Sequence, residues 1–160
     1  MAIEVTVKKT EPTTVAFISR KGSFREIPEA FGKLYGWTGQ KGYIPSGPPI
    51  GVFFNVPGQV PESELIWELR APIAGAVAAS GPDKEGLGVK RVKETLVAST
   101  MHKGPYEETG PVYGALAASV AEKGYEIAGP PEEVYFSEPT TPPKEILTEI
   151  RFPVRKAKKE

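Results

Sequence analysis

The chain repeats itself: residues 14–49 read TVAFISRKGSFREIPEAFGKLYGWTGQKGYIPSGPP, and residues 96–131 read LVASTMHKGPYEETGPVYGALAASVAEKGYEIAGPP. A shift of 82 positions aligns the two stretches without a gap. Their identities include turn-forming sequences, namely the Lys-Gly, Lys-Gly-Tyr and Gly-Pro-Pro of each copy. After one small gap the alignment continues as far as residues 72 and 153. Because such self-similarity marks repeated supersecondary units, we predict two copies of one folding unit.

Each copy is predicted to form a strand, a helix and two further strands. The opening strands, at residues 15–20 and 96–102, are short and are either β-branched or alternating in pattern. Pro28 and Pro111 suit the first turn of the helices that follow, and a Lys-Gly sequence ends each helix. The apolar residues at helical spacing are Ile27, Phe31, Leu34 and Tyr35 in the first copy and Val112, Leu116 and Val120 in the second.

The last two strands of each copy follow its Gly-Pro-Pro sequence. The first of them is predicted at residues 51–55 and at residues 133–137. The final strand of the first copy alternates Leu65, Trp67 and Leu69 with polar residues, so one of its faces is buried. The expected fold is therefore α+β, with one antiparallel sheet and two main helices on one face of it. A ligand cleft is expected at the pseudo-twofold seam between the copies.

The domain organisation follows from the repeat. With 160 residues, of which 39% are apolar, the chain can form one sizeable core, so we predict a single domain over residues 1–160. Its parts are expected to be a first repeat at about 1–73, a crossover at 74–88, a second repeat at about 89–155 and a charged tail at 156–160.

The composition argues against several function classes. Twenty basic and twenty acidic residues cancel, so there is no net charge to attract nucleic acid. The chain has no cysteine and a single histidine, so we expect neither a metal site nor a cofactor. The N-terminus lacks the apolar core of a signal peptide, and no apolar run is long enough to span a membrane. We therefore expect a cytoplasmic protein that binds neither nucleic acid nor a membrane directly.

Glu133 is the first candidate site residue. The period of a strand places Glu133 and Tyr135 on one face, beside each other. In the repeat alignment they correspond to Gly51 and Phe53, so the acid of one copy stands where the other copy has no side chain. A carboxylate among aromatic residues needs a partner, which a lipophilic cation would provide. The alternative is an exposed glutamate at the edge of the sheet.

The remaining candidates are aromatic residues and the single histidine. His102 and Tyr106 belong to a turn that enters the second helix, where His102 either caps and packs or takes part in catalysis. The aromatic residues could line a pocket or fill the core, and the pattern does not decide between these roles. The aromatic candidates for ligand contact are Tyr106, Tyr113, Tyr135, Trp37, Phe53 and Trp67.

The chain resembles the GyrI-like small-molecule-binding domains, which are also known as AraC-type effector-binding domains. The resemblance rests on HKGPYEE, KGYEIAGPPEEVYFSEP and TEIRFPV in the second copy and on VAFISRKGSF and GPPIGVFFNVP in the first. It covers essentially the whole chain. It implies a duplicated unit, a pocket glutamate at Glu133 and a pocket tyrosine at Tyr106.

The resemblance implies three possible functions. Members of the family include the effector domains of multidrug-responsive regulators, which bind lipophilic cations against a glutamate, and this reading predicts sequestration or sensing. Some free-standing members resemble hydrolases that open the cyclopropane rings of genotoxic natural products, and in that reading Glu133 and Tyr106 would be catalytic. A relative inhibits gyrase, so a separate protein partner is a third possibility. The sequence contains no helix-turn-helix segment, so direct control of transcription is not expected.

Overall fold

A computed structural model describes residues 3–138 and 140–158, and its chain forms two compact units. The N-terminal unit comprises residues 11–93, and the C-terminal unit comprises residues 94–160 together with residues 1–10. The predicted tail at 156–160 ends in two residues that lie outside the described part of the chain. Each unit has its own cluster of buried apolar side chains, so each is described by itself below.

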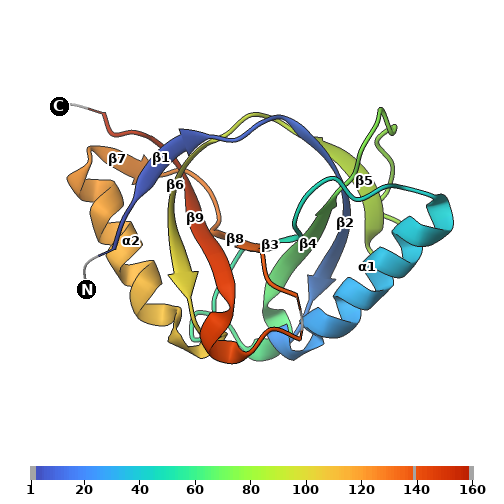
Figure 1. The fold of residues 1–160 in the computed structure, drawn as a ribbon, viewed down its shortest axis with the longest axis horizontal. Coiled ribbons are helices and arrows are strands. Elements are labelled where there is room, and N and C mark those ends of the chain that lie inside the picture. Colours follow the sequence, from blue (N-terminus) through green and yellow to red (C-terminus); the bar gives the residue numbers. More distant parts are fainter. Residues whose placement is uncertain (1–2, 139, 159–160) are drawn as a thin grey trace. The chain divides into compact units, whose positions relative to one another are not determined.

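The N-terminal unit is a four-stranded antiparallel sheet with one long helix packed along it (Figure 1). Its strands run in the order β3, β4, β2, β5. In chain order its elements are β2 (Thr13–Lys21), the 3-10 turn η1 (Phe24–Glu26), α1 (Ile27–Lys41), β3 (Ile50–Phe53), η2 (Glu62–Glu64), β4 (Ile66–Pro72) and β5 (Leu87–Val92).

The C-terminal unit repeats this plan with an additional short strand. Its strands run in the order β1, β6, β9, β8, and β7 also pairs with β9. In chain order its elements are β1 (Thr6–Lys9), β6 (Leu96–Lys103), η3 (Tyr106–Glu108), α2 (Gly110–Glu122), β7 (Tyr125–Ile127), β8 (Glu132–Tyr135), η4 (Pro143–Glu145) and β9 (Leu147–Lys156). α2 packs against β6, β7 and β9.

The α+β class, the antiparallel strands and the two main helices are confirmed. Proline lies in the first turn of both helices, and Gly42 ends α1 with a φ of 73° in the left-handed region, as the Lys-Gly signal predicted. β1, β5 and β7 were not predicted. β7 has three residues and β1 is a largely polar strand of four, so neither carries a periodic apolar signal.

The prediction for the buried face of α1 is confirmed for Leu34, which is fully buried, and for Ile27 and Phe31, which pack against the core. Ala30, Leu34 and Thr38 are buried, whereas Tyr35 is exposed and stacks on Phe31 at a ring distance of 6.2 Å. The pattern missed Ala30 and Thr38, which carry only a weak apolar signal. In α2 the predicted Val112, Leu116 and Val120 are the buried residues.

β4 is buried on the predicted face, where Trp67, Leu69 and Leu65, which directly precedes the strand, are at most 2% exposed. The indole nitrogen of Trp67 donates a hydrogen bond to the carbonyl oxygen of Gly22 at 2.9 Å. On the opposite face Glu68 is also buried, because Arg70 and Lys90 pair with its carboxylate. This strand is therefore enclosed on both sides.

Candidate functional site

In the C-terminal unit Glu133 is held by two phenols. Tyr113, in the first turns of α2, donates a hydrogen bond to Glu133 Oε2, and Tyr135 donates one to Oε1 at 2.9 Å. Glu133 lies opposite Ile150 of β9, a core residue that packs with α2, so the carboxylate is on the helix-facing side of the strands. α2 and β8 together therefore position one carboxylate between two neutral donors.

The carboxylate of Glu133 has no ion pair in the part of the chain that the structure describes. Its neighbour Glu132 points to the opposite face, where Arg151 Nη2 lies 2.8 Å from its Oε1. Glu132 is thus neutralised by a cation, whereas Glu133 is contacted by uncharged hydroxyls. A nearby positive charge would stabilise the half-buried carboxylate of Glu133 more than uncharged hydroxyls do. The Glu133 cluster is therefore suited to bind a cation.

The phenols of the cluster stay protonated to unusually high pH. Burial, followed by the charge of Glu133, raises the pKa of Tyr113 and of Tyr135 above the ordinary value of 10.0. A hydrogen bond donated to a carboxylate also raises the pKa of each phenol, because ionisation would break the bond and place two negative charges together. The two hydroxyls therefore act as donors.

Tyr106 lies at the open edge of this cluster. Its side chain is 45% exposed, and its ring meets that of Tyr135 edge-on at 6.0 Å. Burial and the charge of Glu133 raise the pKa of Tyr106, and the nearby Thr148 hydroxyl opposes them in part. The Tyr106 and Thr148 hydroxyls are close but do not form a hydrogen bond that meets the usual geometry. Tyr106 can therefore turn its hydroxyl toward a ligand.

His102 and Thr148 lie beneath this edge, in one row across β6, β9 and β8. Thr148 pairs with His102 on one side and with Tyr135 on the other. His102 is buried, and its Nε2 lies 3.1 Å from the carbonyl oxygen of Pro105, so it closes the turn that carries Tyr106. His102 thus packs and caps in this structure. Sequence reasoning missed Thr148, although its alignment with Trp67 could have drawn attention to it.

The other three predicted site residues lie in the N-terminal unit. Trp67 is 0% exposed within its core. Phe53 is buried there too, with its ring edge-on to Phe24 at 5.2 Å. Trp37 is partly buried against the same core and meets Tyr43 at 5.7 Å. The structure therefore groups Glu133 with Tyr106, Tyr113, Tyr135 and His102, and it places Trp37, Phe53 and Trp67 in the core of the other unit.

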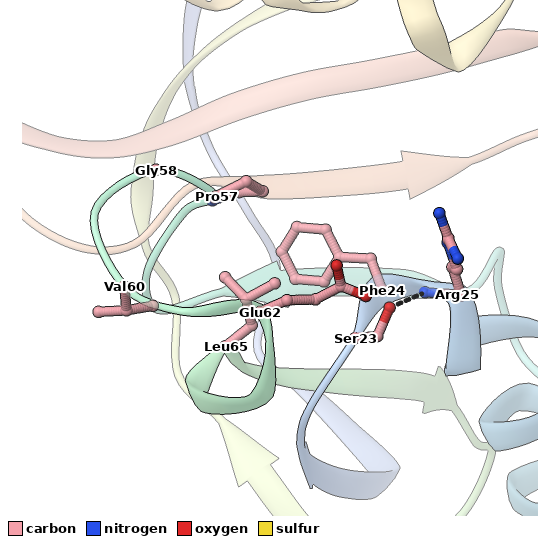
Figure 2. A pocket seen from close by; sticks show the side chains of 8 residues that line it. All are labelled: Ser23, Phe24, Arg25, Pro57, Gly58, Val60, Glu62 and Leu65. Carbon is pink, nitrogen blue, oxygen red and sulfur yellow. Dashed lines mark hydrogen bonds between the residues drawn. The ribbon is translucent and has the colours of Figure 1, made fainter.

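A pocket of about 370 Å³ opens on the N-terminal unit (Figure 2). It lies between η1, which contributes Ser23, Phe24 and Arg25, and the loop from Pro57 to Leu65. Figure 2 shows the ring of Phe24 beside this loop, below Pro57, and the Ser23 hydroxyl accepts a hydrogen bond from the backbone nitrogen of Arg25. None of the residues predicted as ligand contacts is among the eight described residues that line it.

The family is decided by a match to the GyrI-like small molecule binding domain over residues 3–155. The chain belongs to this family. No curated protein sequence matches it. Within the described residues no helix has the length and apolar character needed to cross a membrane, and no group of three or more His, Cys, Asp or Glu residues could hold a metal ion.

Solved structures with the same fold accompany the GyrI-like match. EcmrR in its complex with DNA is 17% identical, with a TM-score of 0.81 over 96% of this chain, and the present chain spans 58% of that one. The isolated EcmrR C-terminal domain is 20% identical, with a TM-score of 0.76, 98% of this chain covered and 100% of that domain.

Two further structures with this fold are those of a hydrolase and of a protein with a bound ligand. A hydrolase from Listeria innocua is 15% identical, with a TM-score of 0.73, and the alignment covers 95% of this chain and 92% of that one. SAV2435 bound to tetraphenylphosphonium is 12% identical, with a TM-score of 0.55, and 96% and 94% of the two chains are covered. At these identities the likeness establishes the GyrI-like fold of the present chain.

Proposed function

We propose that this GyrI-like domain binds a lipophilic cation with aromatic character against Glu133, and that it serves to sequester or sense such molecules. The observation that carries the proposal is a carboxylate with two phenol donors and no basic partner among the described residues. The family supplies the coarser statement that the domain binds small molecules.

The surroundings of Glu133 favour a soft cation over a metal ion. Its two oxygens already accept one phenol proton each, and the rings of Tyr106, Tyr113 and Tyr135 surround it. Aromatic faces attract organic ammonium and phosphonium ions through their quadrupoles. The tetraphenylphosphonium complex of SAV2435 is an instance of such a ligand on the same fold.

The test is calorimetric titration with phenethyltrimethylammonium and with its neutral carbon isostere, 3,3-dimethylbutylbenzene. Calorimetry is preferable to tryptophan fluorescence because both tryptophans lie in the N-terminal unit. In Glu133→Gln the affinity for the cation should fall about tenfold or more, which corresponds to about 1.4 kcal/mol. The affinity for the isostere should remain unchanged.

Glu107→Gln is the matched control, because it removes an exposed negative charge close in sequence to Tyr106. It should leave the affinity for the cation within about twofold of wild type, since exposed charges are screened by solvent. Equal losses in the two variants would mean that the general negative charge of the unit attracts the cation. Absence of saturable binding to wild type would contradict the proposal altogether.

Hydrolysis of a strained ring is the second candidate function, and the observation that favours it is the half-exposed phenol of Tyr106 within the electrostatic reach of Glu133. In this reaction a water oxygen attacks a cyclopropane carbon and gives its proton to Glu133. The ring C–C bond breaks, its electron pair passes to a conjugated carbonyl of the substrate, and the carbonyl oxygen takes the Tyr106 proton. The proton on Glu133 then restores Tyr106.

Turnover separates the two candidates. The protein should be incubated with a cyclopropane conjugated to a dienone, and the formation of the ring-opened alcohol followed by mass spectrometry in ¹⁸O-labelled water. Label in the product formed by wild type, and its loss in both Glu133→Gln and Tyr106→Phe, would establish hydrolysis. Stoichiometric binding without formation of product would support binding and would contradict hydrolysis.

A further inference from the structure

The Thr148 hydroxyl is enclosed by protein and has no hydrogen-bond partner among the described residues. An unpaired buried hydroxyl costs stability, and most buried polar atoms in folded proteins are paired. Thr148 also lies on the helix-facing side of β9, between His102 and Tyr135. Its side chain therefore lies on the same face of the sheet as the candidate site and interacts with the side chain of the half-exposed Tyr106.

In the N-terminal unit an apolar side chain fills the position that is equivalent to Thr148. There the strand residue opposite Phe53 is Trp67, just as Thr148 is opposite Tyr135. The indole of Trp67 fills the space and its nitrogen bonds to the Gly22 carbonyl. In the C-terminal unit a small side chain takes that position, and His102 caps the turn instead. Where the N-terminal unit has an indole, the C-terminal unit thus has a threonine, and the threonine hydroxyl is not needed for packing.

Resting on the proposed function, we propose that the Thr148 and Tyr106 hydroxyls form a neutral subsite that binds a hydroxyl group of the ligand. The two hydroxyls are near each other, and Thr148 makes no hydrogen bond of regular geometry, so a ligand oxygen that enters when the Tyr106 ring turns can donate to one hydroxyl and accept from the other. This contact would satisfy Thr148. The half-exposed Tyr106 ring lies over the subsite and would turn to admit the ligand.

The distance between the Glu133 carboxylate and the proposed hydroxyl subsite sets the length of the ligand. Glu133 is paired with Ile150, and Thr148 lies two residues before Ile150 on β9, so Glu133 and Thr148 are diagonal neighbours on one face. Such neighbours are roughly 7–8 Å apart. The favoured ligand therefore carries a cationic group and a hydroxyl at the two ends of one aromatic ring system.

The experiment compares two probes that differ by one oxygen, phenethyltrimethylammonium and its 4-hydroxyphenethyl analogue. Wild type should bind the hydroxylated cation about tenfold more tightly by calorimetry. Thr148→Val keeps the shape of the side chain and should abolish this preference while it leaves the affinity for the oxygen-free cation unchanged. Thr148→Ser retains the hydroxyl and should retain the preference.

The outcomes separate this proposal from the function on which it rests. Equal binding of the two cations by wild type, or an undiminished preference in Thr148→Val, would overturn the subsite alone. If neither cation binds, both proposals are overturned. Thermal unfolding of Thr148→Val checks its fold, and its Tm should equal or exceed that of wild type because the substitution removes an unpaired buried hydroxyl.

Discussion

The two units differ in the polarity of the side chains at equivalent positions. In the N-terminal unit these positions are apolar and pack into or against the core, whereas in the C-terminal unit they carry a carboxylate and four hydroxyls. The equivalent pairs are Gly51 and Glu133, Phe53 and Tyr135, Phe24 and Tyr106, Phe31 and Tyr113, and Trp67 and Thr148. Even the edge-on ring contact is shared, at 5.2 Å between Phe24 and Phe53 and at 6.0 Å between Tyr106 and Tyr135. One backbone plan therefore accommodates either a closed core or a polar site.

The largest expected effect tests whether Trp67 and Thr148 have different roles. Trp67→Ala should lower the free energy of unfolding by about 3–5 kcal/mol, because it leaves a cavity in the core and an unpaired Gly22 carbonyl. Urea unfolding followed by circular dichroism measures this. Thr148→Val, at the equivalent position, should change the free energy of unfolding by no more than about 0.5 kcal/mol or raise it. Similar losses of unfolding free energy in both variants would mean that Trp67 and Thr148 have the same role in packing.

A smaller effect is expected from exchanging phenol and phenyl. Tyr113→Phe should lower the free energy of unfolding by about 1.5–3 kcal/mol, since Glu133 loses a charge-assisted hydrogen bond. Phe31→Tyr is the matched control, because the residue aligned with Glu133 in that unit is Gly51, which has no carboxylate to accept the added hydroxyl. It should change the free energy of unfolding by less than about 1 kcal/mol. A neutral result for Tyr113→Phe would mean that water replaces the phenol without loss.

Near neutral pH the smallest effect is expected from the raised pKa values of the tyrosines, which lower stability only in alkaline solution. The pKa values of Tyr106, Tyr113 and Tyr135 are raised in the folded chain, so above pH 10.0 the unfolded chain loses phenol protons that the folded chain keeps. The stabilisation is complete below pH 10.0, and stability falls as pH rises, by about 1.4 kcal/mol per unit for each of the more deeply buried Tyr113 and Tyr135 and by less for the half-exposed Tyr106. Urea titrations at successive pH values would measure the slope.

The matching control is the variant in which all three tyrosines carry the phenylalanine of the N-terminal unit. Its stability should depend much less on pH in this range. An unchanged slope would mean that other groups cause the alkaline loss. Glu133→Gln should reduce the slope in part, since the charge of Glu133 contributes to each raised pKa.

The sequence predicts those features that depend on local spacing. The helices, their proline starts and the buried face of Leu65, Trp67 and Leu69 follow from periodicity, and the structure confirms them. The same period-2 rule placed Glu133 beside Tyr135, and the structure brings their side chains into contact. These are short-range relations that one element determines by itself.

The remaining features depend on packing between elements. Phe53 and Trp67 have the same aromatic character as Tyr135, so no pattern could tell that they fill the core of another unit. A single threonine has no spacing signature, and the importance of Thr148 lies in its burial without a partner. The exposed Tyr35 shows the same limit in α1, where helical spacing assigned it to the buried face.

The indole of Trp67 has a consequence for how such a domain can change over generations. In a duplicated chain, one copy with a well-packed apolar core provides a reserve of stability. Polar or unpaired groups can then accumulate in the other copy before the stability of the chain falls below the threshold for folding. Substitutions around Glu133 and Thr148 would then alter ligand preference at little risk to the fold. Substitutions around Trp67 would be removed by selection. The repeat thus separates robustness from adaptability within a single polypeptide.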